Sequence, residues 1–281
     1  MKNIFVLGAG TMGLDIAQAF ANSGYYVTVR DINDDIISAA SKRLHKGLLK
    51  RVERGKLEQG KMDELLLMIN FTTDMKQAAE ADLVIEAIVE NVEVKRSVFA
   101  ELDGICKEGA ILGTNTSSIS ITEIASATKR PEKVIGMHFF NPATVMKLVE
   151  VIRGVHTSDE TYAAVCEAAA SIGKQPVEVK EYPGFVVNRI LIPMINEAAG
   201  LVAENIASVE DIDAAMKLGC NHPMGPLALG DLIGLDVVLA IMDTLNRETG
   251  DPKYRAHTLL RKMVRGGLLG KKTGRGFYTY R

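Results

Sequence analysis

Three glycines near the start of the chain have the spacing of a phosphate-binding turn. Gly8, Gly10 and Gly13 form the pattern G-x-G-x-x-G after an apolar run, and apolar residues at helical spacing follow them. In that setting the glycines permit a tight turn, close approach of a pyrophosphate to the backbone, and close packing of helix on strand. The N-terminus of the helix supplies positive charge. The motif, with Thr11 and Met12 inside it, therefore predicts a dinucleotide site.

An acidic residue stands where such a site meets the adenosine ribose. Asp31 follows the β-rich run at residues 25–29. A carboxylate there accepts hydrogen bonds from the ribose hydroxyls and repels a 2′-phosphate, which favours NAD over NADP. Arg30 keeps NADP open, because a guanidinium beside this position tolerates the phosphate. The alternative interpretation of Asp31 is a carboxylate that caps a helix or turn.

Hydride transfer to a carbonyl also requires a proton donor that titrates near neutral pH, and histidine is the usual choice. Of the five histidines, His138 ends an apolar run, at the edge where doubly wound sheets bind ligands. Glu150 is the only charge within the apolar run at residues 148–152, and a buried carboxylate needs a partner. We expect Glu150 to orient His138 and to favour its protonated form. A purely structural hydrogen bond is the alternative.

Six short motifs occur in a fixed order along the chain. They are residues 8–13 (GAGTMG), 86–90 (EAIVE), 114–118 (TNTSS), 136–142 (GMHFFNP), 183–189 (PGFVVNR) and 222–226 (HPMGP). Through these motifs the chain resembles, over its whole length, the 3-hydroxyacyl-CoA dehydrogenases, and most closely the bacterial members that act on 3-hydroxybutyryl-CoA. Six motifs in the right order are far more specific than any one of them.

The resemblance implies a catalytic set. His138 is then the general acid/base, Glu150 its partner, and Ser117 and Asn188 hydrogen-bond partners of the substrate and the histidine. Ser117 follows an apolar run, so its hydroxyl is expected at the same sheet edge as His138. The other interpretation of Ser117 is a helix N-cap, a role for which Ser118 and Ser120 compete. The other interpretation of Asn188 is an amide that only packs.

The resemblance also assigns residues to the nicotinamide half of the cofactor. Glu90 and Lys95 are implied near the ribose, Asn115 and Ser117 beside the ring, and Lys272 as a further contact. The alternative for Lys95 is a solvated helix residue, although no acid stands among its helical neighbours to pair with it. The alternative for Lys272 is a basic surface tail.

A basic helix is predicted for the large end of the substrate. Coenzyme A carries a 3′-phosphate and a diphosphate, so its site needs cations near the catalytic cleft. Four cations fall on one face of a helix over residues 42–56, namely Arg43, Lys46, Lys50 and Arg54. Most such runs are only solvated faces. The charges of this segment are nearly all positive, although the whole chain has a net charge of -2. The family that the chain resembles also uses this region for the CoA nucleotide. Both points favour Lys50 and Arg54 as phosphate contacts.

The reaction that the resemblance implies is NADH-dependent reduction of acetoacetyl-CoA at C3, with His138 donating the proton and the S alcohol as product. Oxidation is the reverse reaction. Two other functions stay open. A β-hydroxyacid dehydrogenase would act on a free acid, usually with a lysine base, and a non-catalytic relative similar to a lens crystallin would keep the fold for binding or bulk. The presence of every catalytic residue disfavours the non-catalytic function.

The elements that would hold these residues fall into two groups. Apolar runs, mostly separated by helical stretches, lie at residues 3–7, 25–29, 83–88, 110–114, 133–139, 148–152 and 176–179. This alternation predicts an α/β fold, with a mostly parallel, Rossmann-type doubly wound sheet over residues 1–183. After a Pro-Gly pair, apolar-periodic segments predict an all-helical domain over residues 184–281. These segments lie at 185–205, 208–218, 226–246 and 257–266, with a strand-like run only at 276–278.

Composition limits the classes of function. The length of 281 residues suits two domains, and 47% hydrophobic with 24% charged residues is ordinary globular composition, which disfavours disorder. The net charge of -2 disfavours a nucleic-acid partner. Three widely spaced cysteines predict neither a disulfide nor a metal site, and they fit a reducing cytoplasm. No apolar stretch suits a membrane span. The apolar helical segments suggest a homodimer.

Overall fold

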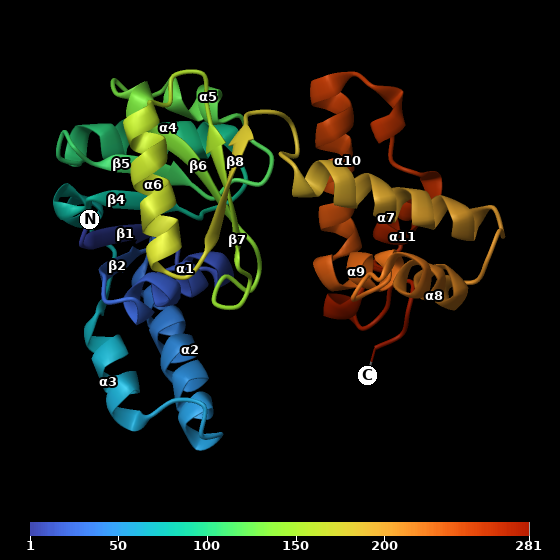
Figure 1. Cartoon of the computed structure of the whole chain (residues 1–281), viewed down its shortest axis with the longest axis horizontal. Helices are drawn as coiled ribbons and strands as arrows, with labels where there is room; N and C mark the ends of the chain where they lie inside the picture. The colour runs from blue at the N-terminus through green and yellow to red at the C-terminus, as the bar shows by residue number, and fades with distance from the viewer. Residues whose placement is uncertain (281) are drawn as a thin grey trace. The chain divides into compact units, whose positions relative to one another are not determined.

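The structure is a computed structural model, and it describes residues 1–280. The chain divides into two compact units, which adjoin in the sequence at Glu181 and Tyr182. The first unit carries an eight-stranded sheet with helices, and the second is built of helices (Figure 1). The predicted fold class, a doubly wound α/β sheet followed by an all-helical part, is confirmed.

The sheet has the order β3-β2-β1-β4-β5-β6-β7-β8. Its strands are β1 Asn3–Leu7, β2 Tyr26–Arg30, β3 Ile69–Thr72, β4 Leu83–Glu86, β5 Ile111–Thr114, β6 Val134–Phe139, β7 Leu148–Arg153 and β8 Gln175–Lys180. Every neighbouring pair is parallel except β6 and β7, which are antiparallel. The winding reverses between β1 and β4, and the carboxyl ends of strands at such a switch point are where doubly wound sheets bind ligands.

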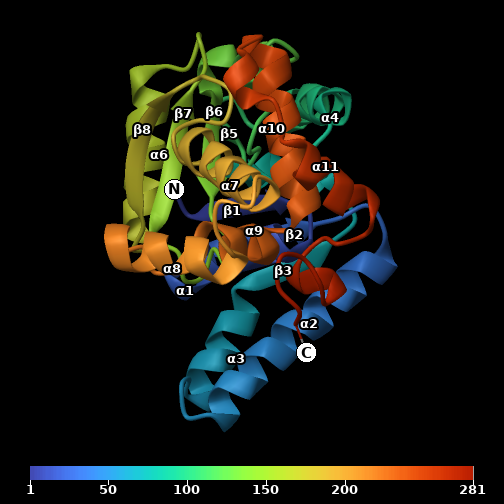
Figure 2. The same cartoon turned by 90° about the vertical axis from the view of Figure 1, so that its right-hand side faces the viewer.

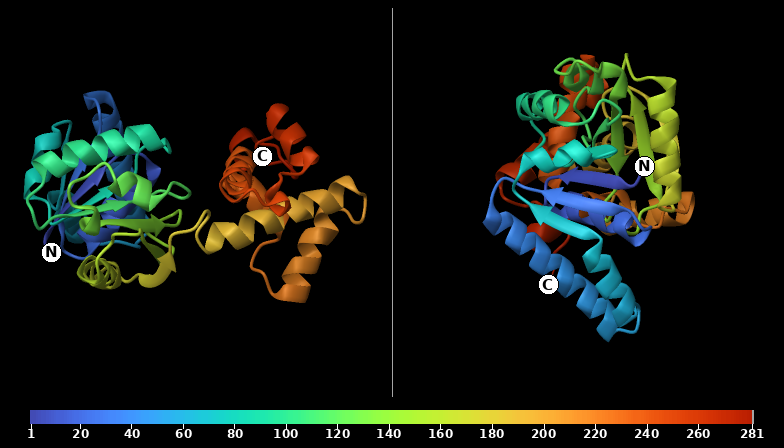
Figure 3. Two further views of the ribbon diagram at one scale, coloured as in Figure 1. Left: turned by 90° about the horizontal axis from the view of Figure 1, so that it is seen from above. Right: turned by 90° about the vertical axis from the view of Figure 1, so that its left-hand side faces the viewer.

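Helices cover both faces of the sheet. Ile4 of β1 belongs to an apolar core that the strands share with α1 and α6, and Phe5 points to the opposite face, because side chains alternate along a strand. Figure 3 shows α4 and α6 on opposite sides of the strands. The α-helices of this unit are α1 Thr11–Asn22, α2 Asp34–Glu53, α3 Gln59–Leu67, α4 Val92–Ile105, α5 Ile121–Ala125 and α6 Asp159–Ser171.

The second unit packs helices around its own apolar core. Up to residue 280 its α-helices are α7 Val187–Ala203, α8 Val209–Cys220, α9 Pro226–Ile233, α10 Leu235–Thr249 and α11 Thr258–Arg265. Helix α7 packs against α9, α10 and α11 (Figure 2). Ile195, Leu235 and Met242 are among the fully buried side chains between them. Within residues 1–280, no helix has the length and apolar character that a bilayer crossing requires.

Three elements differ from the sequence-based predictions. Strand β3 is not predicted, because only Ile69 of its residues is buried and the apolar pattern is therefore weak. The helix predicted over residues 226–246 is two helices, α9 and α10, because Gly234 interrupts it with a φ of 103°. The strand-like run at 276–278 forms no regular strand within the described residues, and only isolated bridges join Arg275 to Gly270 and Thr279.

Candidate active site

The glycine loop that connects β1 to α1 is shaped by close backbone packing. A Cβ on Gly8 would lie 2.4 Å from the Ala87 carbonyl oxygen, and a Cβ on Gly13 would lie 1.9 Å from the Gly8 carbonyl oxygen. Gly8 also has a φ of 106°, which favours glycine. The protein's own packing therefore requires these two glycines. Gly10 differs, because a Cβ there would meet nothing within 4 Å.

The open side of the loop fits an anionic ligand. Gly10 and Thr11 are exposed, Met12 is half-buried, and across residues 1–280 no side chain caps the start of α1. N–H groups at the start of a helix lack intrahelical partners, and the helix dipole favours negative charge at this end. The space at Gly10 and these N–H groups together suit the pyrophosphate of a dinucleotide.

Two side chains hold the Ala9 peptide groups of this loop. The Ala9 N–H donates to Asp31 Oδ2 at 2.7 Å, and Arg43 Nη2 donates to the Ala9 carbonyl oxygen at 2.9 Å. Arg30 is directed elsewhere, because its Nε donates to the Thr73 carbonyl oxygen at 3.2 Å. The cap of α2 is Asn33, so Asp31 caps no helix. The turn half of that alternative is present, because Asp31 Oδ1 accepts from the Ile32 N–H at 2.7 Å. The contact of Arg43 was not predicted, although its basic helix was.

His138 and Glu150 form a buried pair on adjacent strands. They are register partners on β6 and β7, and His138 Nδ1 lies 2.8 Å from Glu150 Oε2. Only 7% of His138 and 1% of Glu150 is exposed. The His138 ring also lies 4.5 Å from the Phe140 ring, measured between centroids. The contact expected between the two residues is present, and it fixes the orientation of the imidazole at the carboxyl end of β6.

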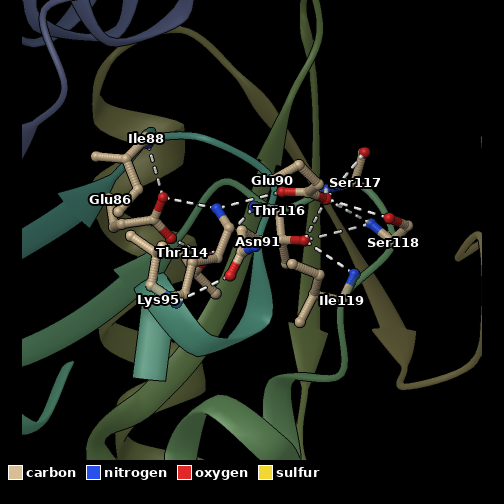
Figure 4. A network of polar contacts seen from close by, with 11 residues as sticks. Glu86, Ile88, Glu90, Asn91, Lys95, Thr114, Thr116, Ser117, Ser118 and Ile119 are labelled. Carbon is tan, nitrogen blue, oxygen red and sulfur yellow. Dashed lines mark hydrogen bonds and ion pairs between the residues drawn. The ribbon is translucent and has the colours of Figure 1, made fainter. Parts of the chain in front are cut away.

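Lys95 is buried in α4 between two carboxylates (Figure 4). Its Nζ lies 2.6 Å from Glu86 Oε1 and 3.2 Å from Glu90 Oε2. With 1% of its surface exposed, the interpretation of Lys95 as a solvated residue is wrong. Both acids come from outside the helix, Glu86 from the end of β4 and Glu90 from the segment after it, so helical spacing could not find them.

Glu90 in turn binds the segment after β5. Its Oε1 accepts hydrogen bonds from the Thr116 hydroxyl at 2.6 Å, the Ser117 N–H at 2.9 Å and the Ser117 hydroxyl at 3.2 Å. The Ser118 N–H and hydroxyl each donate to it at 3.2 Å. Burial raises the pKa of Glu90, but the Lys95 ammonium and these donors outweigh burial and hold that pKa below its ordinary value. Ser120 caps α5, so the N-cap interpretation of Ser117 is wrong.

Asn115 ties three strand ends together. Its N–H donates to the Glu86 carbonyl oxygen at 2.7 Å, and its side-chain Oδ1 accepts from the Phe139 N–H at 2.8 Å. Asn115 follows β5, Glu86 ends β4 and Phe139 ends β6. One edge of the sheet therefore gathers the glycine loop, the Glu90 and Lys95 pair, Asn115, Ser117, and the His138 and Glu150 pair.

Two predicted residues belong to the helical unit. Asn188 is buried in the first turn of α7. Lys272 Nζ lies 2.6 Å from Asp236 Oδ1, so Lys272 is not a loose surface residue, although 45% of its side chain is exposed. Among residues 1–280, no group of three or more acidic, histidine or cysteine side chains could hold a metal ion.

The four cations predicted on one helix face lie on or just beyond α2. Arg43, Lys46, Lys50 and Arg54 are exposed, whereas Leu44 and Leu48 of the same segment are buried. Since Arg43 touches the glycine loop, the helical rise puts Arg54 roughly 16 Å further along. Figure 1 shows α2 and α3 extending together beyond the sheet of the first unit. The cations therefore run outward from the dinucleotide loop.

Comparisons with known proteins agree with this geometry. Residues 3–182 match the family model described as 3-hydroxyacyl-CoA dehydrogenase, NAD binding domain, and residues 184–280 match the C-terminal domain of the same description. The chain is 58% identical over 275 residues to the 3-hydroxybutyryl-CoA dehydrogenase of Clostridioides difficile, covering 98% of each chain. It is 53% identical over 280 residues to a probable 3-hydroxybutyryl-CoA dehydrogenase of Bacillus subtilis, covering 100% of this chain and 98% of the relative.

A solved structure is similar over the whole chain. The crystal structure of the (S)-3-hydroxybutyryl-CoA dehydrogenase from Ralstonia eutropha superimposes with a TM-score of 0.96 at 49% identity. The match covers 100% of this chain and 99% of that one. Likeness at this level extends to both the sheet unit and the helical unit.

Proposed function

The chain belongs to the 3-hydroxyacyl-CoA dehydrogenase family and is an NAD-dependent oxidoreductase, and from that premise we propose that it reversibly reduces acetoacetyl-CoA to (S)-3-hydroxybutyryl-CoA. The observation that carries the proposal is the buried pair of His138 and Glu150, 2.8 Å apart at the sheet edge that also holds the glycine loop. The relatives described above support the four-carbon thioester as the substrate.

The cofactor half of the site is proposed to work through the glycine loop and the network around Lys95. Bound NADH supplies the hydride. The N–H groups at Gly10, Thr11 and Met12 bind its pyrophosphate, with Gly8 and Gly13 shaping the loop. Each oxygen of Asp31 accepts one backbone hydrogen bond, from the Ala9 and Ile32 N–H groups, and keeps a lone pair for the adenosine ribose. Glu90, Lys95, Asn115 and Ser117 orient the nicotinamide end, with Lys272 as a further contact.

His138 is proposed as the residue that moves the proton. In reduction it donates a proton to the C3 oxygen of the substrate, which gains negative charge as hydride adds to C3, and in oxidation it accepts that proton from the hydroxyl. Glu150 holds Nδ1, orients the ring and balances the charge of the imidazolium. Ser117 and Asn188 donate hydrogen bonds that position the substrate oxygen. A water-poor site strengthens these contacts, and the low exposure of His138 supports such a site.

The remaining assignments concern the substrate's nucleotide and the assembly. Lys50 and Arg54, exposed at the far end of α2, are proposed to contact the phosphates of coenzyme A. Residues 1–183 are proposed as the NAD-binding domain and residues 184–281 as the substrate and dimerisation domain. Exposed apolar side chains in the helical unit, such as Ile190, Ile206 and Leu218, support a homodimer.

Initial rates of NADH oxidation with acetoacetyl-CoA test the proposed reaction. We expect fast turnover that requires the CoA moiety and prefers NADH, so NADPH and free acetoacetate serve as parallel controls. Equal activity on free acetoacetate would indicate that the substrate is a free hydroxyacid and not a CoA thioester. An absence of turnover in protein that binds NADH would favour a non-catalytic role or another substrate.

A further inference from the structure

Glu86 is a fully buried acid at the carboxyl end of the central strand β4. Its exposed fraction is 0%, and it pairs in register with Leu7 of β1 and Thr114 of β5. Three donors satisfy its carboxylate. Oε1 accepts from Lys95 Nζ at 2.6 Å and from the Ile88 N–H at 2.7 Å, and Oε2 accepts from the Thr114 hydroxyl at 2.7 Å. Figure 4 shows these contacts converging on the one side chain.

The fold does not need an acid here to begin α4 or to close the sheet. Asn91 caps α4 with its own side chain, and the β4 and β5 backbones pair up to Glu86 and Thr114. Burying a carboxylate with an ammonium is often less stabilising than apolar packing of the same volume. An ion pair in this place therefore calls for a reason other than stability. It lies next to the segments that carry Glu90 and Ser117, so a role in the cofactor site is one such reason.

The second link leads from Lys95 to the loop after β5. Lys95 lies between Glu86 and Glu90, and Glu90 binds the Ser117 N–H and hydroxyl. Glu86 is buried, whereas 37% of the Glu90 side chain is exposed. Glu86 thus holds the Lys95 ammonium in place from its buried side. Lys95 in turn holds Glu90, the acid that binds the Ser117 segment.

We propose that Glu86 is a positioning residue for the nicotinamide end of the cofactor site, acting through Lys95 on Glu90 and Ser117. The proposal rests on the proposed roles of Lys95, Glu90 and Ser117 in binding NAD. Because none of its surface is exposed, Glu86 acts in this proposal without touching substrate or cofactor. If the network only stabilised the fold, removing the charge on Glu86 would lower stability and leave the affinity of folded protein for NADH unchanged.

The central variant is Glu86→Gln, which keeps the size of the side chain and removes its charge. Lys95 then shifts toward Glu90, its remaining acidic partner. Glu90 moves with it and no longer holds the Ser117 segment in one position. We expect Kd for NADH to rise about tenfold, with a similar rise in KM and a smaller fall in kcat. The chain has no tryptophan, so the titration follows the emission of NADH itself.

A double-mutant cycle shows whether Glu86 affects NADH binding through Glu90 or independently of it. If Glu86 acts through Lys95 and Glu90, Glu86→Gln adds little to the rise in Kd that Glu90→Gln causes alone. The double variant should then bind NADH about as weakly as the Glu90→Gln single variant. A Kd for Glu86→Gln within about twofold of wild type, or effects that multiply fully in the double variant, would overturn the proposal.

The matched control lies at the other end of the same strand. Asp82 precedes β4 and accepts hydrogen bonds from Lys107 Nζ at 2.5 Å and from the Asn3 N–H at 3.0 Å. Asp82→Asn removes an acid that is likewise paired with a lysine, away from the cofactor loops. We expect it to lower the melting temperature and to leave Kd for NADH unchanged. A weakened affinity there would mean that NADH binding merely reports stability, which would overturn the proposal.

Two provisions keep the test decisive. If Glu86→Gln does not fold, Thr114→Val takes its place, because it removes the single donor to Oε2 and leaves both charges. It also removes the acceptor of a long contact from the Thr116 N–H at 3.3 Å. About threefold weaker NADH binding, again not additive with Glu90→Gln, is then expected, and an unchanged Kd would overturn the proposal. The titrations contain no acyl-CoA. A chain that fails to reduce acetoacetyl-CoA would therefore contradict the proposed reaction and leave the result on Glu86 standing.

Discussion

Arg43 and Asp31 hold the polar groups of Ala9 from opposite elements, α2 and the end of β2. Arg43→Met removes the hydrogen bond and the charge but keeps a side chain of similar reach. We expect KM for NADH to rise about fivefold with little change in kcat, since the loop that carries Gly10 loses one of its two supports. Steady-state kinetics at saturating acetoacetyl-CoA measures both constants.

Arg30 provides the control for this variant. Its Nε donates to the Thr73 carbonyl oxygen, away from the loop. Arg30→Met should therefore leave KM for NADH and the preference for NADH over NADPH unchanged. An unchanged KM in Arg43→Met, or a large change in Arg30→Met, would contradict the assignment of Arg43 as the cation that supports the loop.

At single residues, sequence reasoning worked where the chemistry was local or carried by a motif. The pairing of His138 with Glu150 was predicted because a lone charge in an apolar strand requires a partner. The partners of Lys95 were missed, because helical spacing only relates residues of one helix. Glu86 belongs to a strand and meets Lys95 only in the folded sheet.

A buried acid of α9 binds the backbone of the C-terminal segment in the helical unit. Asp231 on α9 accepts hydrogen bonds from the Phe277 N–H at 3.0 Å and the Tyr278 N–H at 2.9 Å. A Cβ on Gly276 would lie 1.9 Å from Asp231 Oδ1. Gly276→Ala should therefore lower the free energy of unfolding by about 2 kcal/mol, measured by urea denaturation.

A second glycine in the same unit serves as the comparison. A Cβ on Gly219 of α8 would meet nothing within 4 Å. Gly219→Ala should be neutral or stabilise the protein by up to about 1 kcal/mol, since alanine is the better helix former. Equal destabilisation by both substitutions would contradict the role of Asp231 as the anchor of the C-terminal segment.

Helix α2 links the dinucleotide loop to the proposed CoA phosphate contacts. The double variant Lys50→Met and Arg54→Met should raise KM for acetoacetyl-CoA about tenfold, because two charge-assisted contacts to phosphate are lost. The KM for a short acetoacetyl thioester without the nucleotide should not change. Arg51→Met, which removes an exposed cation from the same helix, is the control. An equal rise in KM for acetoacetyl-CoA and for the short thioester would contradict the assignment of Lys50 and Arg54 as phosphate contacts.

Elements were predictable where apolar patterns were strong. The runs that became β1, β4 and β6 are almost fully buried, so their patterns were clear in the sequence. The edge strand β3 buries one residue and gave no such pattern. The break at Gly234 was missed because the apolar periodicity continues across it, and only the backbone conformation of that residue separates α9 from α10.

For the whole molecule, the change of pattern after Pro183 and Gly184 predicted a sheet followed by a helical part. The structure has both, as two compact units that adjoin at Glu181 and Tyr182. The oligomeric state needs a separate measurement. Sedimentation equilibrium at micromolar concentration should give twice the chain mass of 30.5 kDa, because the exposed apolar side chains of the helical unit favour self-association. A mass of one chain would contradict the proposed dimer.

The central claim is that His138 moves the proton in an NAD-dependent reduction. His138→Gln keeps a hydrogen-bonding side chain at the end of β6 but cannot supply a proton. The account predicts a fall in kcat of at least about 100-fold, with Kd for NADH within twofold of wild type. Turnover close to that of the wild-type enzyme, in protein that binds NADH normally, would contradict it.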